Sequence, residues 1–204
     1  MMEKPLENHV ATEDSKQSRL ILEDQLRECY GRVVYTHKTQ EKCADLLQGR
    51  LEKIKLAQII LSAITTSGFI AAILGADKIA VVFGAIISVV LLALNAYTKD
   101  HDLGEIAQKH RAAGADLWII REKYFSLITD LRMGEKPIEN LQIERDALLE
   151  NLHAVYVGAP STSYEAYALA QKALKEMEDM TFSDAEIDAF LPASLKRGKT
   201  SESS

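Results

Sequence analysis

Residues 56–98 read LAQIILSAITTSGFIAAILGADKIAVVFGAIISVVLLALNAYT. They contain two uncharged apolar runs, 56–76 and 79–98, which are separated only by Asp77 and Lys78. A helix rises about 1.5 Å per residue, so each run is long enough to cross the roughly 30 Å hydrocarbon core of a bilayer. A two-residue link between helices of this length requires a tight antiparallel turn. The stretch therefore predicts a transmembrane hairpin with almost nothing on the far side of the membrane.

The charges around the hairpin predict its orientation. Lys53 and Lys55 precede the first run and Lys99 follows the second. Basic residues beside a span favour the cytosolic side, so we expect both termini in the cytosol. The first residues are polar and lack the apolar core of a signal peptide, so none is expected. Residues 99–204 carry 13 basic and 19 acidic side chains. Because this acidic part is a poor match for polyanions, no nucleic-acid binding is expected.

Both helices of the hairpin are expected to continue into the cytosol. The chain has no proline between Pro5 and Pro137, and its apolar positions recur in alternating steps of four and three both before the first span and after the second. This spacing is typical of a coiled-coil seam, and it predicts helices over 15–76 and 79–133 whose seams face each other. The first seam is Leu22, Leu26, Cys29, Val33, Thr36, Gln40, Cys43 and Leu47, and the second is Ile106, His110, Ala113, Leu117, Ile120, Tyr124, Leu127 and Leu131.

The rest of the chain predicts shorter helices and disordered ends. The segment 138–192 contains three helical patterns, the second of which is expected to bury Tyr167 and Met177, while Ser183 and Glu186 form a capping box for the third. The polar ends, 1–14 and 193–204, are expected to be disordered. The predicted fold is an all-α membrane protein. Its two long antiparallel helices form a transmembrane hairpin (56–76 and 79–98), a coiled-coil-like cytosolic stalk (15–55 and 99–133) follows, and a short C-terminal helical bundle is added.

No catalytic chemistry is recognisable along the chain. There is no phosphate-binding glycine loop, no His-Glu-x-x-His, no Cys-x-x-Cys and no nucleophile elbow. Asp100, His101 and Asp102 are consecutive, so on a helix their side chains point about 100° apart and do not converge on one ion. We therefore expect no enzyme activity, no catalytic residue, no metal and no cofactor.

Polar residues inside the spans have two interpretations. Intramembrane polar groups are costly toward lipid and face protein or water. They line a hydrated path between several hairpins, or they let the two spans pack closely and hydrogen-bond across. Packing is favoured for the small residues. The carboxamides of Gln58 and Asn95 lie at similar depth near the expected cytosolic end of the spans. They have two interpretations: a ring of carboxamides in an oligomer, or a bond to each other. The candidates are Gln58, Ser62, Thr65, Thr66, Ser88 and Asn95.

Three polar or aromatic positions of the stalk also have two interpretations each. His110 lies in the seam and His37 lies one residue from it, so each is a packed core histidine or a pH switch. Trp118 is one turn from Arg121, so the pair is a stacking or docking element, or Trp118 belongs to the core. In each case the packed core is the favoured interpretation.

Several motifs resemble those of the SLATT family of small two-span membrane proteins, which are associated with SMODS nucleotidyltransferases and SLOG nucleotide-sensing domains. They are YTHK at 35–38, LWIIREKY at 117–124 and TFSDAEIDAFLP at 181–192. The resemblance implies a pore-forming effector of bacterial conflict or antiviral defence systems, which oligomerises in the inner membrane once a partner senses a trigger. It also implies a neighbour-encoded nucleotidyltransferase or nucleotide sensor as partner. The motif or gating residues that it indicates are Tyr35, His37, Lys38, His110, Trp118, Arg121 and Tyr124.

A non-conducting role is the alternative. The spans contain no acidic or basic residue, and the cytosolic part is large and acidic. The chain would then be a two-span scaffold that recruits a cytosolic partner or sensor to the membrane.

Overall fold

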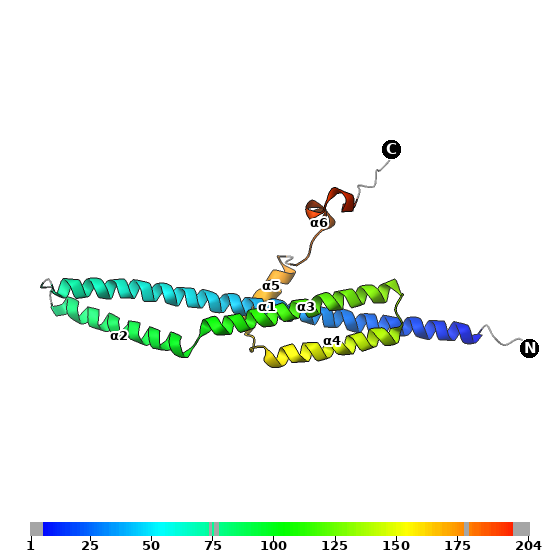
Figure 1. The fold of residues 1–204 in the computed structure, drawn as a ribbon, viewed down its shortest axis with the longest axis horizontal. Coiled ribbons are helices and arrows are strands. Elements are labelled where there is room, and N and C mark those ends of the chain that lie inside the picture. The colour runs from blue at the N-terminus through cyan, green and yellow to red at the C-terminus, as the bar shows by residue number, and fades with distance from the viewer. Residues whose placement is uncertain (1–5, 74, 76–77, 178–179, 198–204) are drawn as a thin grey trace, which may run out of the picture.

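The computed structural model describes residues 6–73, 75, 78–177 and 180–197. Within these residues every regular element is helical (Figure 1). The elements are α1 (Leu6–Ile73), α2 (Lys78–Asp100), α3 (Leu103–Met133), α4 (Ile138–Gly158), α5 (Tyr164–Lys175), α6 (Asp184–Phe190) and the single 3₁₀ turn η1 (Ala193–Leu195). The all-helical prediction is confirmed for this part of the chain.

Helix α1 organises the molecule. It runs the length of a narrow rod, with α2 and then α3 lying beside it in the opposite direction, and α4 folding back along α3 (Figure 1). The return at the far end of the stalk is made at Gly134, whose φ of +75° ends α3 in the left-handed conformation that glycine adopts most readily. The predicted helix stop at Gly134 is confirmed.

The hairpin of α1 and α2 has the surface of a membrane anchor. Two helices of the structure are long and apolar enough to cross a membrane, and their most apolar stretches are 0% buried within the chain. Ile59 on α1 and Val89 on α2 are each 66% exposed, and Ile73 is 71% exposed. A core helix of a soluble protein would bury such side chains, so this surface requires an apolar solvent.

The stalk formed by α3 and the part of α1 that precedes the spans has a continuous core where the two seams meet. Leu26 and Val33 of α1 and Leu117 and Tyr124 of α3 are all fully buried, and Leu141 of α4 closes the core from the side. The predicted seams therefore do face each other. Burial is incomplete at Thr36 and Leu47, which are half-buried. Beside the membrane Ile106 is exposed and its neighbour Ala107 is buried instead.

The predicted continuous helix over 79–133 is wrong, because the chain breaks at His101 and Asp102. The Asp102 carboxylate accepts a hydrogen bond from the backbone N of Glu105 at 2.9 Å and caps α3. A capping residue has a non-helical backbone, so it ends the continuity between α2 and α3. A Cβ on Gly104 would lie 3.2 Å from Asp102 Oδ1, so glycine leaves room for the capping carboxylate.

Asp102→Ala is expected to lower the free energy of unfolding of the stalk by about 1 kcal/mol, because the first turn of α3 loses its side-chain acceptor. Urea unfolding of the full chain in mild detergent measures this. Asp100→Ala is the matched control, since Asp100 ends α2 and does not cap α3. Equal effects of the two substitutions would show that Asp102 has no capping role.

The ends of the chain are more ordered than expected. Residues 6–14 carry no glycine or proline, and α1 begins at Leu6 rather than near residue 15. Residues 1–5 and 198–204 lie outside the described residues. At the other end, 193–195 form η1, and Arg197 reaches back to the Asp184 carboxylate at 2.7 Å. This ion pair holds part of the segment that was expected to be disordered.

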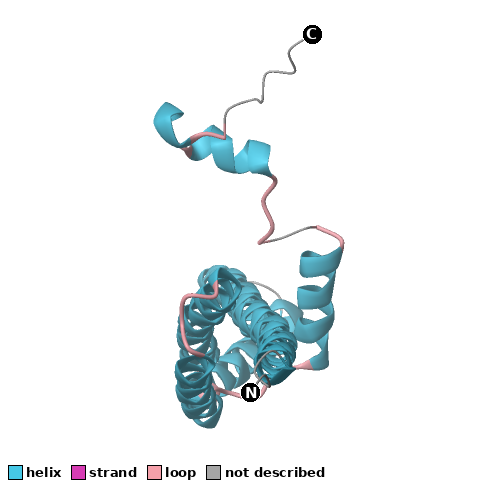
Figure 2. Ribbon diagram, turned by 90° about the vertical axis from the view of Figure 1, so that its right-hand side faces the viewer, coloured by secondary structure: helices cyan, strands magenta, loops and turns pink. Residues whose placement is uncertain are grey.

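The three C-terminal helices occupy different places. The principal contacts of α4 are with α3, and those of α5 are with α1. On α5 the buried residues are Ala166, Ala170 and Ala173, whereas Tyr167 and Met177 are exposed, so the expected burial of these two is wrong. Small alanine side chains let α5 approach α1 closely. Helix α6 stands away from the stalk (Figure 2), and Ser183 and Glu186 form its predicted capping box.

Candidate functional site

A pair of carboxamides joins the two spans at the end of the hairpin that adjoins the stalk. Gln58 Nε2 donates to Asn95 Oδ1 at 2.9 Å and to Thr98 Oγ1 at 3.3 Å. Within the chain, Gln58 and Asn95 therefore bond to each other, which is one of the two arrangements that their depth allowed. Asn95 also remains exposed to the outside of the hairpin. The pair fixes the register of α1 against α2 where the stalk enters the membrane.

The hydroxyl groups of the spans bond to their own helices. Ser62, Thr65, Thr66 and Ser88 each donate to the carbonyl four residues earlier, at 2.7–2.9 Å. This pattern satisfies the hydroxyl inside the helix and leaves no need for a partner across the hairpin. Thr65 and Ser88 are half-buried between the spans, whereas Ser62 and Thr66 are exposed on the hairpin surface. The exposed pair is the part of this set that is free to meet another hairpin.

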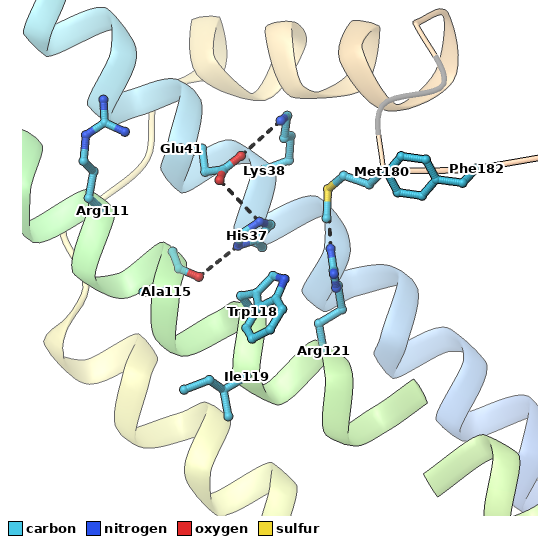
Figure 3. A pocket seen from close by; sticks show the side chains of 11 residues that line it. His37, Lys38, Glu41, Arg111, Ala115, Trp118, Ile119, Arg121, Met180 and Phe182 are labelled. Atoms are coloured by element: carbon cyan, nitrogen blue, oxygen red, sulfur yellow. Dashed lines mark hydrogen bonds and ion pairs between the residues drawn. The ribbon is translucent and has the colours of Figure 1, made fainter. Parts of the chain in front are cut away.

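A cavity of about 690 Å³ lies halfway along the stalk and brings four of the motif residues together (Figure 3). His37 and Lys38 come from α1, and Trp118 and Arg121 come from α3. Met180 and Phe182, from the segment between α5 and α6, close one side. The remaining lining residues are Glu41, Arg111, Gly114, Ala115 and Ile119. Sequence motifs separated by about 80 residues thus contribute to one site.

His37 is held from two sides. Its Nδ1 lies 2.9 Å from the carbonyl oxygen of Gly114, and since a carbonyl only accepts, Nδ1 carries the proton. Its Nε2 lies 3.5 Å from Glu41 Oε1. Glu41 also accepts a hydrogen bond from Lys38 Nζ at 3.0 Å. His37 and Lys38 are both buried, so their side chains are oriented by these contacts at the floor of the cavity.

The stacking interpretation of Trp118 and Arg121 is the one the structure bears out. The guanidinium carbon of Arg121 lies 5.8 Å from the centre of the indole ring, within cation–π range. Trp118 is 48% exposed, so its placement in the core was wrong. Arg121 is itself largely buried, with a side chain 15% exposed, and it pairs with the carboxylate of Glu122. Arg121 is therefore a wall of the cavity.

A buried polar relay, which is a chain of two hydrogen bonds, links α1, α3 and the segment between α4 and α5. His110 Nδ1 donates to Gln40 Oε1, and Gln40 Nε2 donates to the carbonyl of Pro160 at 3.4 Å. His110 and Gln40 are each at most 3% exposed. Sequence reasoning identified His110 as a candidate but included Gln40 only as one position of the seam. The signal was a glutamine at a seam position, because a buried carboxamide requires partners for both its donor and its acceptor.

The free energy of unfolding is expected to decrease as the pH is lowered below the ordinary histidine pKa of 6.5, because burial lowers the pKa of His110 in the folded state. The unfolded chain then binds more protons than the folded chain, so acidification favours unfolding, by at most about 1.4 kcal/mol per pH unit. Unfolding of the full chain in urea at pH 7.5, 6.5 and 5.5 measures the slope.

His110→Asn is the matched variant for this pH dependence. The amide of asparagine replaces the Nδ1–H donor toward Gln40 but does not titrate. Cys43 and Arg50 of α1 face the same space as His110, and Arg50 is paired with Glu165 of α5. These groups remain in the variant, so a slope that His110→Asn leaves unchanged would show that the pH dependence does not come from His110.

The two remaining motif tyrosines are packing residues. Tyr124 is fully buried in the core of the stalk, and its hydroxyl has no hydrogen-bond partner in the described part of the chain. Burial, with a further contribution from the neighbouring Cys29, raises the pKa of Tyr124 to about 12. Tyr35 is half-buried and its ring lies 6.1 Å from that of Tyr167 on α5. Neither residue lines the cavity.

The turn at residues 100–102, beside the membrane, contributes to the structure of the helix ends. Asp102 caps α3, and His101 stacks on Tyr97 of α2 with ring centres 4.8 Å apart. Among the described residues, no group of three or more histidine, cysteine, aspartate or glutamate side chains is placed to hold a metal ion.

Comparison with known proteins assigns the chain to a family. None of the curated proteins or solved structures compared with it matches. A family model described as SMODS and SLOG-associating 2TM effector domain family 4 matches residues 22–186, which includes the whole hairpin, the cavity and the start of α6. The chain therefore belongs to this SLATT family, and it is a two-span membrane protein of the effector class.

Proposed function

We propose that the chain is the membrane effector of a bacterial conflict or anti-phage defence system, and that it oligomerises and permeabilises the inner membrane when its cytosolic helices are triggered. Both termini then lie in the cytosol, and a nucleotidyltransferase or nucleotide sensor of the kind named in the family description is the partner. The observation that carries this proposal is the direct mechanical link between the cavity-bearing stalk and the hairpin.

The link runs through α1. This helix contains the floor of the cavity at His37 and the carboxamide at Gln58, with no break between them. A shift of α1 in the stalk therefore moves the first span. The second span is joined to the stalk differently, because His101 and Asp102 interrupt the helix. The break lets α2 reorient relative to α3 while the Gln58–Asn95 bond keeps the two spans in register.

The surface of the hairpin supports assembly rather than a closed monomer. Ser62, Thr66 and Asn95 are exposed on the apolar hairpin, where contact with lipid is unfavourable. Contact with another copy, or with water in a shared pore, removes this cost. The spans carry no charged side chain, so we expect such a pore to select weakly between ions.

Replacing Gln58 and Asn95 together by leucine is expected to lower the leak of the induced protein, because an apolar constriction at the cytosolic mouth excludes water. Membrane potential and dye entry after induced expression in a bacterial host measure the leak. Ser67→Ala is the control, since Ser67 donates to Ala63 O and lies outside the candidate set. An unchanged leak in the leucine variant at equal membrane content contradicts the lining role.

A foreign two-span anchor in place of 56–98 separates the pore from a scaffold. If the protein acts by permeabilising the membrane, the swap abolishes both the depolarisation of the host membrane and the protection of the host against phage. Undiminished protection by the swapped protein would instead establish a non-conducting scaffold that recruits its partner through the stalk.

A further inference from the structure

The cavity of the stalk combines an exposed aromatic face with cationic donors. Trp118 and Phe182 are 48% and 67% exposed, so both rings keep accessible surface. Lys38, Arg111 and Arg121 are the cations of the lining, and among the described lining residues Glu41 is the one carboxylate. Each cation has a carboxylate partner, which is Glu41, Asp45 or Glu122 in turn. At about 690 Å³ the cavity is within the usual range for small-molecule sites, 300–1,000 Å³. An aromatic face beside a guanidinium suits a planar ligand that carries negative charge.

One donor in the cavity has a poor partner. Arg121 directs its Nε and Nη2 to Glu122, but its Nη1 points at the thioether sulfur of Met180, at 3.6 Å (Figure 3). A thioether is a weak acceptor, whereas hydrogen bonds from arginine to carboxylate or phosphate oxygens are among the strongest in proteins. An anionic oxygen in this position would therefore replace the sulfur.

The backbone of Met180 supports the same interpretation. Met180 has a φ of +71°, and among the described residues no other non-glycine residue has a positive φ. A long side chain in this conformation is unfavourable, and such residues gather at ligand sites and switches. The residue with the unusual backbone conformation is thus the same residue whose sulfur occupies the free donor of Arg121.

We propose that this cavity binds a small organic anion in which a planar aromatic ring carries a phosphate group, as in a nucleoside phosphate. The ring stacks on Trp118, and a phosphate oxygen accepts from Arg121 Nη1 in place of Met180 Sδ. Lys38, at the floor of the same cavity, is a second cation of the lining and is paired with Glu41. The inference concerns the stalk alone and holds whether or not the hairpin conducts.

The tryptophan of the chain is a built-in reporter for this site. The sequence contains a single tryptophan, Trp118, so its fluorescence in the full chain in detergent micelles reports on this cavity without labelling. The probes are the four common ribonucleoside 5′-monophosphates, each titrated to millimolar concentration, with adenosine and inorganic phosphate as partial ligands. Saturable quenching by at least one of the monophosphates is expected. Its affinity should exceed that of adenosine and that of phosphate.

Two substitutions should move the affinity in opposite directions. Arg121→Gln removes the charged donor and is expected to weaken binding about tenfold or more. Met180→Ala removes the competing sulfur and is expected to tighten it severalfold. Arg132→Gln, on the same helix and paired with Glu23 outside the cavity, is the matched control and should bind like the parent. Helicity by circular dichroism checks that each variant is folded.

The outcomes decide the proposal. Absence of saturable quenching with all four monophosphates overturns it, as does equal binding of adenosine, which would exclude the phosphate contact. Equal binding of inorganic phosphate alone would exclude the aromatic contact. Weaker binding in Met180→Ala would show that Met180 contacts the ligand rather than competing with it, and would also overturn the proposed displacement.

Discussion

Tyr124→Ala is expected to lower the free energy of unfolding of the stalk by about 3–5 kcal/mol. The ring of Tyr124 is fully buried in a core where α1, α3 and α4 meet, so its removal leaves a cavity that three helices must collapse to fill. Such collapse is incomplete in a close-packed core, and the lost contacts add to the lost burial. Urea unfolding of the full chain in mild detergent, followed by Trp118 fluorescence, measures the change.

Tyr124→Phe separates the ring from the hydroxyl. Because the hydroxyl has no hydrogen-bond partner among the described residues, its deletion is expected to leave stability unchanged or to raise it by about 1 kcal/mol. A loss comparable to that of Tyr124→Ala would show that the hydroxyl is bonded in solution, and that the role of Tyr124 is polar rather than steric.

Gln40→Leu is expected to cost about 2–3 kcal/mol, because it leaves the buried Nδ1–H of His110 without an acceptor. The double variant with His110→Leu should recover much of this loss, since an apolar pair of similar shape has no unsatisfied donor. A double-mutant cycle measures the coupling between the two positions. Strict additivity of the two single effects would contradict a direct bond between the side chains.

Thr36→Val is the matched control for the relay. Thr36 is the other polar residue of the α1 seam, and its hydroxyl lies 3.0 Å from that of Tyr156 on α4. This contact is exposed, so water replaces it when the hydroxyl is removed. The expected loss is below about 1 kcal/mol. A loss as large as that of Gln40→Leu would mean that burial is not what makes the relay costly to break.

The hairpin and the stalk core could be predicted from sequence because each depends on a repeated pattern. Two uncharged runs of helical length identify the spans, and alternating steps of four and three identify Leu26, Val33, Leu117 and Tyr124 as core. The interruption at Asp102 was missed, although the pattern Asp102-x-x-Glu105 was present in the sequence. The seam positions keep the same spacing over four heptads, and this regular pattern was given more weight than the single capping pattern that precedes it.

The cavity could not be predicted because its walls come from distant parts of the chain. Stacking of Trp118 and Arg121 was only the less favoured of two interpretations. Nothing in the sequence places Met180 beside them, since α5 must first dock on α1 through its alanines. Gln40 was undervalued for a related reason. The hydrogen-bond partners of Gln40 are His110 and Pro160, which lie 70 and 120 residues away in the sequence and come together only in the folded chain.

The length of α1 gives the molecule a mechanical advantage. The helix has 68 residues, so it is roughly 100 Å long. If it tilts as a stiff rod by about 5° around one end, its other end moves by about 9 Å, nearly the diameter of a helix. A displacement at the cavity that is small enough to be caused by one side chain is thus magnified along the rod. If hairpins assemble into a pore as proposed, opening it needs no refolding of the spans, only a change in the angle at which α1 leaves the stalk.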